Sequence, residues 1–333
     1  MKAHLGRGFE PHKCVKIVLF VTKGPFHRGT ESINSLLDHN ALAFARLRTH
    51  MVTAPKPRLR RSRYERAASP IPLNRTRRDE EICAALRDFG FLSTIQLCSW
   101  VFGSLTALPY LRERVRKLFD ARELHRQFLI EQPRGSPTTV HSLKPRNHHY
   151  RSQLFMRHTL EANELLVLAR KLTQASPGFH LARVFTEYQL KRIPIYVASN
   201  SHKQAVIADA FIDLRTPEQH CVAFELDRDT AFRDPICAKV EGWLEAERGP
   251  YQDWAGADRL TVAFVVTQGG ERRVTQLLNW TENVLRETGR QLSADLFRFA
   301  AFDPATANPE QVFFRPIWKR PFEQQLVPLI QGG

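Results

Sequence analysis

Cysteine is scarce in this 333-residue chain: there are five, and no two are spaced as a CxxC pair. An odd number of scattered cysteines predicts neither a zinc knuckle nor a disulfide framework. Long apolar runs are also missing, since the longest one near the start, Ile17 to Val21, is too short for a membrane span or a signal-peptide core. We therefore expect reduced, mostly buried thiols in a cytoplasmic protein without a membrane partner.

Several motifs of well-known chemistry are absent as well. Neither GxxxxGKS/T nor GxGxxG occurs, which disfavours ATPases and dinucleotide-binding enzymes, and there is no HxE-type zinc signature. The adjacent His148 and His149 are interpreted as surface residues, because adjacent residues rarely bind one metal ion. Tyr150, which follows them, is only a weak match to the tyrosine of a strand-transferring relaxase.

The charge of the chain is unevenly distributed. The formal net charge is +15, and residues 1–150 hold 27 Lys and Arg against 12 Asp and Glu, whereas residues 151–333 hold 22 of each. All of the excess therefore lies in the first half. This predicts a polyanion-binding front end joined to a neutral back end. A highly soluble protein without a nucleic-acid partner is the alternative.

The length predicts two domains, and the contents of 43% hydrophobic and 25% charged residues are ordinary globular values. Residues 1–78 are interpreted as a basic N-terminal extension and linker. Within them, Pro55 to Arg78 contain four prolines and nine Lys or Arg against one Glu. Such a stretch cannot bury a core, so we expect an extended linker that contacts phosphates beside a DNA-binding domain. The fold of residues 1–53 is left open.

Residues 79–150 show the element order of a winged helix, and we expect a DNA-binding domain of this kind. Three helical segments are followed by two strand-like segments, at Asp79 to Gly90, Thr94 to Phe102, Thr106 to Asp120, Glu123 to Ile130 and Thr138 to Leu143. The third helix has one apolar stripe, and basic residues cover its flanks. Candidate contacts to double-stranded DNA are Arg112, Arg114, Arg116 and Lys117 on that helix and Arg134 in the turn between the strands. A protein-binding domain would have the same element order.

Residues 151–179 are interpreted as a connecting helix and residues 180–333 as an α/β domain. In the connecting helix, His158 is interpreted as a capping or packing residue, because no partner His or Cys lies at helical spacing. The second domain reads as helix, three strands, helix, strand, helix, strand. The ranges are Leu181 to Arg192, Pro194 to Ala198, Ala205 to Leu214, Cys221 to Asp227, Pro235 to Glu247, Arg259 to Thr267, Glu271 to Thr288 and Leu296 to Phe302.

The chain from about residue 79 to residue 300 resembles the replication-relaxation family of bacterial plasmid and mobile-element proteins, in which a winged helix precedes a PD-(D/E)xK-like domain. The matching segments are VRKLFDARELHR, HTLEANE, TEYQLKR, IADAFIDL and FELDRDT. The resemblance implies an α+β protein whose restriction-endonuclease-like domain has a mixed central sheet. It also implies a role in replication or relaxation of plasmid or mobile-element DNA, with other replication or mobilisation proteins as partners.

The acidic residues of IADAFIDL and FELDRDT point to metal chemistry. Glu225 and Asp227 share one strand face, and a neighbouring strand can bring Asp209 beside them. Carboxylate oxygens at one spot suit Mg²⁺, which polarises a phosphate and activates water. The resemblance implies Asp209 and Glu225 as catalytic metal ligands and Asp227 or Glu187 as an auxiliary ligand, so Mg²⁺ is expected only if the site is catalytic.

The sequence departs from the family's nuclease motif. Ala208 stands where a proline normally precedes the first aspartate, and Asp227 takes the position of the motif's lysine. Lys239, on the next predicted helix, could supply that cation, and a solvent-facing Lys239 is equally compatible with the pattern. The sequence therefore predicts a DNA-binding protein, and leaves open a metal-dependent endonuclease or nickase, or a winged-helix transcription regulator with a non-catalytic C-terminal domain.

Overall fold

The computed structural model describes residues 62–330, apart from 63, 71, 131–136, 144–152, 200–201 and 217. These residues belong to one compact unit. The expectations for residues 1–53, Arg134, His148, His149 and Tyr150 lie outside the described residues. Every helix in the described part of the chain is too short or too polar to cross a membrane.

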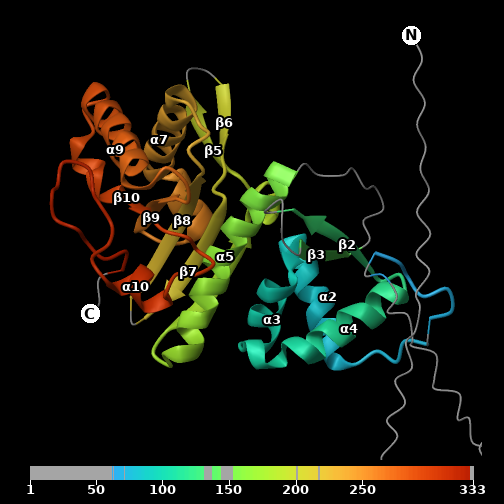
Figure 1. Cartoon of the computed structure of the whole chain (residues 1–333). Helices are drawn as coiled ribbons and strands as arrows, with labels where there is room; N and C mark the ends of the chain where they lie inside the picture. Colours follow the sequence, from blue (N-terminus) through green and yellow to red (C-terminus); the bar gives the residue numbers. More distant parts are fainter. Residues whose placement is uncertain are drawn as a thin grey trace, which may run out of the picture. The chain divides into compact units, whose positions relative to one another are not determined.

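Residues 77–143 form three helices and a small antiparallel sheet (Figure 1). The strands follow the order β1-β3-β2, so the last two form a hairpin and β3 lies in the middle. The three helices and the two hairpin strands agree with the predicted ranges to within a few residues, whereas β1 was not predicted and the start of the third predicted helix is a separate 3-10 turn. The elements are α2 (Arg77–Phe89), β1 (Phe91–Ser93), α3 (Thr94–Phe102), the 3-10 turn η1 (Leu105–Ala107), α4 (Leu108–Asp120), β2 (Leu124–Leu129) and β3 (Thr138–Leu143).

The starts and ends of the first two helices follow from local chemistry. Thr76 and Ser93 each cap a helix in a capping box, in which the side chain accepts from the third backbone N–H and the third side chain accepts in return. Gly90 and Gly103 follow the last turns with φ of 76° and 71°, a region that disfavours other residues. These signals are all present in the sequence, which explains why the predicted ranges were accurate here.

The segment that precedes α2 differs from the extended linker expected for Pro55 to Arg78. Its described part packs against α4 and β2: the guanidinium of Arg66 lies 4.0 Å from the ring centroid of Phe119, and its Nη2 donates to the Leu124 carbonyl at 2.9 Å. The backbone N–H of Ala67 donates to Asp120 at 3.0 Å. An aromatic ring, a backbone carbonyl and a carboxylate of the folded part therefore hold a stretch whose composition alone indicates a linker.

The C-terminal part is built on a five-stranded mixed sheet of order β10-β9-β8-β7-β4. Neighbours are parallel among β8, β9 and β10 and antiparallel among β8, β7 and β4. A separate hairpin pairs β5 with β6. The protein is thus α+β with a mixed central sheet, as expected. The strands are β4 (His180–Thr186), β5 (Ile195–Ser199), β6 (His202–Val206), β7 (Ala210–Arg215), β8 (Gln219–Asp227), β9 (Leu260–Val266) and β10 (Phe297–Ala301).

Helices cover both faces of this sheet. The long helix α5 (Gln153–Ala175) lies between α2–α4 and the sheet (Figure 1), and its leucines share one apolar core with Ile212 of β7 and Leu97 of α3. The next residue along β7, Phe211, faces the opposite core, which α7 and α9 complete. The other helices are α6 (Glu187–Leu190), α7 (Arg233–Glu247), α8 (Pro250–Ala255), α9 (Gly270–Glu287), η2 (Gln291–Leu296) and α10 (Pro309–Phe314).

Two predicted elements of this domain were wrong. Leu181 to Arg192 was expected to be a helix, but its first half, as far as Thr186, belongs to strand β4, which pairs with β7, and only the short α6 is helical. Ala205 to Leu214 was expected to be one strand, but it divides into β6 and β7 around residues 207–209. Within the central sheet alone, the order of helix, three strands, helix, strand, helix, strand is found, with α5 as the first helix and β4, β7 and β8 as the three strands. The β5–β6 hairpin adds two strands outside this order.

Acid should destabilise the protein through His141 of β3. The imidazole is 1% exposed, and burial together with the charge of Arg126 lowers its pKa to about 3. Because the unfolded chain takes up a proton near pH 6.5 and the folded one does not, this stability is complete above pH 6.5 and falls towards pH 3. From pH 7 to pH 5 we expect a loss of about 2 kcal/mol in the free energy of urea unfolding.

The control is a glutamine at the same position. His141→Gln should lose less stability over this pH range than wild type, whereas His180→Gln, at an exposed position, should behave as wild type does. An unchanged pH dependence in His141→Gln would show that other groups cause the acid sensitivity.

Candidate functional site

Asp209 lies where the chain enters the central sheet. Its backbone N–H donates to the carbonyl of Phe224 at 3.0 Å, and its carbonyl accepts from the N–H of Glu187 at 3.1 Å. These bonds extend the pairing of β7 with β8 and β4 by one residue. The backbone therefore holds Asp209 beside β8 and beside the first residue of α6.

Both carboxylate oxygens of Asp209 are engaged. The side chain is largely buried; His158 Nε2 of α5 donates to Oδ1 at 3.0 Å, and the backbone N–H of Leu226 donates to Oδ2 at 2.8 Å. The ammonium of Lys239 lies 3.9 Å from Oδ2. Asp209 thus joins side chains from α5 and α7 to the middle of the sheet.

Glu225 of β8 is the second buried carboxylate, with only 2% of its surface exposed. Trp243 Nε1 donates to Oε1 at 2.8 Å, and the ammonium of Lys239 donates to Oε2. Lys239 and Trp243 are four residues apart on α7, so they lie one above the other on the helix face that covers β8. The structure therefore brings Asp209, Glu225 and Lys239 together. Lys239 forms ion pairs with both carboxylates and is not simply a solvent-facing lysine.

The site shifts the pKa values of the three groups in different directions. Burial by itself would raise the pKa of Asp209, but the charge of Lys239 and the His158 hydrogen bond outweigh it and lower the pKa to about 2. Burial, reinforced by the charge of Asp209, raises the pKa of Glu225 in spite of Lys239. Burial opposes the charge of Lys239, but the two carboxylates raise its pKa overall. Lys239 is therefore a firmly charged ammonium.

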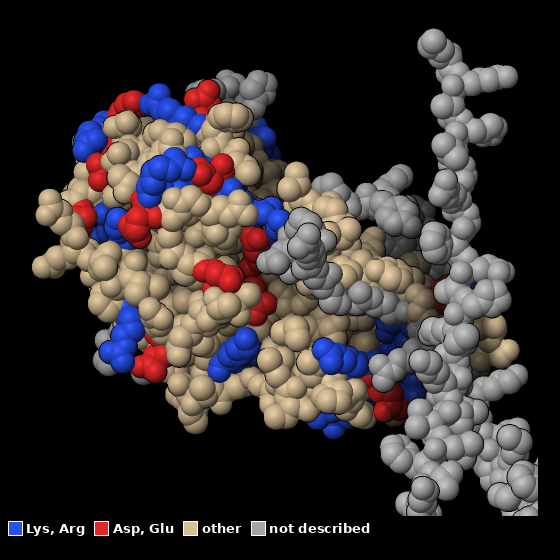
Figure 2. Space-filling model, in the orientation of Figure 1, with Lys and Arg blue, Asp and Glu red and all other residues tan. Residues whose placement is uncertain are grey.

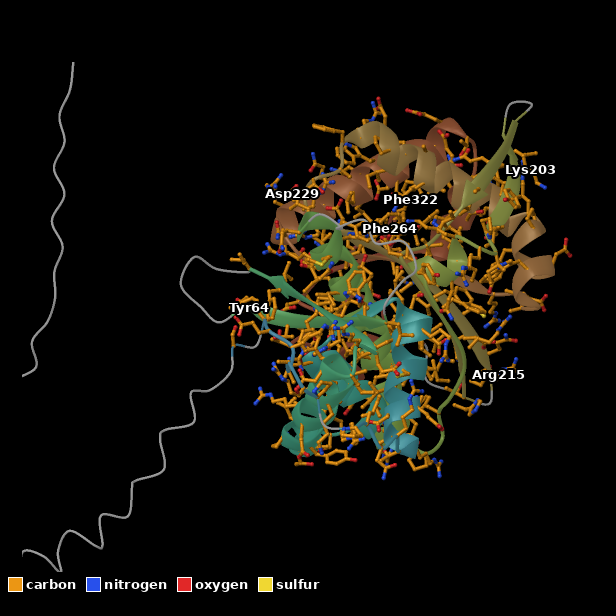
Figure 3. The ribbon with its side chains drawn as sticks, turned by 90° about the vertical axis from the view of Figure 1, so that its right-hand side faces the viewer. Tyr64, Lys203, Arg215, Asp229, Phe264 and Phe322 are labelled. Atoms are coloured by element: carbon orange, nitrogen blue, oxygen red, sulfur yellow. The ribbon has the colours of Figure 1, made fainter. Side chains whose placement is uncertain are left out.

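A pocket of about 270 Å³ opens beside this group, between β6 and α7. Glu225 and Lys239 contribute to its wall, and the other side is formed by residues of the hairpin whose outer end carries Lys203 (Figure 3). Gly242 permits the close approach of the two elements, because a Cβ there would lie 3.1 Å from Val206 Cγ2. The pocket gives a small group access to the Lys239 ammonium, whose side chain is 41% exposed.

A second group of ligating atoms lies on the other side of Asp209. His158, Glu187 and Asp209 each offer one nitrogen or oxygen atom, and these atoms lie within 4.8 Å of one another. Glu187 also forms an ion pair with Lys191 on the surface. The interpretation of His158 as a capping or packing residue missed this contact, because its partners come from other elements and not from its own helix.

Asp227 lies apart from these groups, although it shares a strand with Glu225. Its two oxygens accept from Nε and Nη2 of the buried Arg273 at 2.8 and 2.9 Å. The N–H of Asp229 donates to Oδ1 at 2.9 Å, and Asp229 itself, labelled in Figure 3, pairs with Arg272. Asp227 thus anchors α9 to β8. The expected metal set would require Asp227 to face Asp209, and it does not.

The magnesium site implied by the resemblance does not fit the side chains in this arrangement. The four oxygens of Asp209 and Glu225 already accept from four donors, which are His158, the Leu226 N–H, Trp243 and Lys239. An ammonium lies where a cation shared by the two carboxylates would have to lie. A divalent ion on this pair would have to displace Lys239 against the attraction of two carboxylates.

The expected DNA contacts on α4 divide into exposed and engaged residues. Arg112 is exposed, and Lys117 is half-exposed beside Glu113. Arg114 turns inward instead: its Nε donates to Asp79 at 2.9 Å, Nη2 bonds the other oxygen, and the Asp79 side chain is 1% exposed. Arg114 cannot contact a phosphate without breaking this pair.

Arg116 is occupied by the segment before α2. Its Nη2 donates to the carbonyl of Glu65 at 2.7 Å and its Nε to Asp120 at 3.2 Å. On the visible face of the molecule, basic side chains outnumber acidic ones over α2–α4, whereas the two signs are interspersed over the C-terminal part (Figure 2). Most of the charge excess of residues 1–150 is carried by residues outside the described part, because the described residues of 62–143 hold 11 Lys and Arg against 8 Asp and Glu.

Comparisons with protein-family models, with curated proteins and with solved structures found no match for this chain. The geometry of the site therefore carries the functional argument.

Proposed function

We propose that this protein binds double-stranded DNA through residues 77–143, acting as a winged helix, and cleaves a phosphodiester bond at the Asp209–Glu225–Lys239 group. The observation that carries the proposal is the position of Lys239. A lysine from α7 bonds Glu225 and lies 3.9 Å from Asp209, so a cation sits beside the two carboxylates although the strand lacks the motif's lysine. The resemblance to proteins of plasmid and mobile-element DNA gives the substrate class.

DNA binding is supported by the order of the elements and by charge. Three helices followed by a hairpin is the winged-helix order, in which the third helix enters the major groove. Arg112 and Lys117 on α4 are exposed, and the side chain of Arg77 at the start of α2 is 91% exposed. Such side chains attract phosphates without a desolvation cost.

Phosphodiester chemistry is supported by the preorganised charge of the site. Lys239 is held by two carboxylates, and its side chain is 41% exposed and lines the pocket, where it can donate to a phosphate oxygen as negative charge develops. Asp209 stays ionised and positions Lys239, while Trp243 fixes the Glu225 carboxyl.

One observation favours the second candidate function, a winged-helix regulator with a non-catalytic C-terminal domain. Each oxygen of Asp209 and Glu225 already has a donor, so the group is also a complete structural ion-pair network. In that case the domain serves assembly and DNA is bound without being cut.

Incubation of the purified protein with supercoiled plasmid tests both functions. With Mg²⁺ or Mn²⁺ present, we expect nicked or linear product on a gel and none with EDTA. A plasmid that is shifted but stays supercoiled would contradict cleavage and favour the regulator. A plasmid that is neither shifted nor cut would contradict the proposed function as a whole.

Replacing Arg112 by alanine should weaken DNA binding through charge alone. If Arg112 neutralises one phosphate, the slope of log affinity against log salt concentration should become shallower by about 0.9. Fluorescence anisotropy with a labelled duplex between low and physiological salt measures this slope. The matched control is Arg259→Ala, at an equally charged and exposed position of the C-terminal part, and it should leave the slope unchanged. Equal slopes in all three proteins would contradict the proposed contact between α4 and DNA.

A further inference from the structure

The position of Lys239 leaves one oxygen of Asp209 facing away from the Lys239–Glu225 pair. Oδ2 accepts from Leu226 and lies near Lys239, while Oδ1 faces His158. Any divalent ion at this site is therefore repelled on the Glu225 side and has two further ligand atoms on the other side. The disagreement between the implied magnesium set and the structure thus indicates where a cation would bind.

We propose that His158, Glu187 and Asp209 form a binding site for a first-row transition-metal dication such as Mn²⁺. His158 Nε2 and Asp209 Oδ1 are 3.0 Å apart, and all three ligand atoms lie within 4.8 Å of one another. Two neighbouring ligands about 2.1 Å from one ion and at right angles to each other are separated by about 3 Å, so small side-chain adjustments are sufficient.

The backbone preorganises this site. The N–H of Glu187 donates to the carbonyl of Asp209, so these two residues cannot move independently. Thr186 caps α6 and its hydroxyl also donates to the carbonyl of Asp88 in α2, which fixes the start of the short helix. His158 is on the long helix α5, whose apolar side is packed in the core. The three ligands therefore come from three anchored elements and are not a chance gathering of surface carboxylates.

The ligand types determine which cation is preferred. An imidazole nitrogen favours Mn²⁺, Co²⁺ or Zn²⁺ over Mg²⁺, which takes oxygen ligands almost alone. The His158 side chain is 28% exposed, which leaves an entry path and room for water ligands. The ion and Lys239 would then contact opposite oxygens of the Asp209 carboxylate, so phosphodiester cleavage could take place between them. That catalytic meaning rests on the proposed function, whereas metal binding itself does not.

Isothermal titration of the untagged, metal-free full chain with MnCl₂, in the absence of DNA, tests the site. We expect one Mn²⁺ per chain, bound at least tenfold more tightly than Mg²⁺. His158→Gln keeps a side chain that can donate to Asp209 but removes the imidazole, and it should weaken Mn²⁺ at least tenfold. The exposed His180→Gln should bind Mn²⁺ as wild type does, and thermal unfolding confirms that each variant is folded.

The outcomes separate this inference from the proposed function. Weak Mn²⁺ binding that is lost in Glu225→Gln but kept in folded His158→Gln overturns the inference, as does the absence of any stoichiometric binding. Mn²⁺ bound through His158 with plasmid left intact supports the inference and contradicts cleavage. Plasmid cleavage that is unchanged in His158→Gln, with unchanged Mn²⁺ affinity, supports the proposed function and overturns the inference.

Discussion

Replacing Lys239 by methionine should reduce plasmid cleavage by at least 10²-fold, about the loss expected for one preorganised donor in an active site. Methionine keeps much of the apolar stem that lines the pocket beside Trp243 but removes the ammonium that bonds Glu225. DNA affinity should change little, because the proposed binding surface is on α4. The nicking rate under single-turnover conditions, with protein in excess over plasmid, is the measurement.

This result must be separated from a loss of folding. Without Lys239, Glu225 keeps only the Trp243 donor, and we expect a cost of about 1–3 kcal/mol in the free energy of unfolding. A loss of that size leaves most molecules folded, so the cleavage defect should exceed any decrease in the folded fraction. The matched control is Lys319→Met, which removes a lysine that pairs with the exposed Glu271. Cleavage at the wild-type rate in Lys239→Met would mean that Lys239 is only a structural partner of Glu225.

Arg114→Leu should be the most destabilising change on α4, by about 3–5 kcal/mol, because it leaves the Asp79 carboxylate buried without its main partner. The Asp79 side chain is 1% exposed and that of Arg114 10%, so water cannot easily replace the guanidinium. The backbone and side chain of Thr76 still donate to Asp79 and limit the damage. Urea unfolding followed by circular dichroism measures the loss.

Two further variants establish the cause. Arg112→Leu changes the same residue type two positions earlier, at an exposed site, and should shift stability by no more than about 0.5 kcal/mol. The double variant Asp79→Leu with Arg114→Leu has no unpaired buried charge and should recover part of the stability. If Arg114→Leu is as stable as wild type and instead binds DNA poorly, the inward position of Arg114 is contradicted.

Local signals in the sequence were sufficient for the two helices of residues 77–102. Thr76, Ser93 and the glycines at 90 and 103 act within one turn of chain, so helix starts and ends could be read directly. The range Leu181 to Arg192 failed for the opposite reason. Its first six residues become a strand only because β7 pairs with them at the edge of the sheet, a partner that local periodicity does not reveal.

The sequence by itself determined the two acidic segments, the position of Glu225 in a buried strand, the charge excess of the first half and the three helices and hairpin of residues 77–143. Only the tertiary structure decided which side chains meet. Asp227 shares a strand face with Glu225, yet Arg273 of α9 takes both of its oxygens, while Lys239 of α7 and His158 of α5 reach Asp209 from opposite sides. Such contacts depend on how helices pack on the two faces of the sheet. Helix packing is set by apolar cores that distant segments share, so it cannot be predicted from the spacing of residues within one segment.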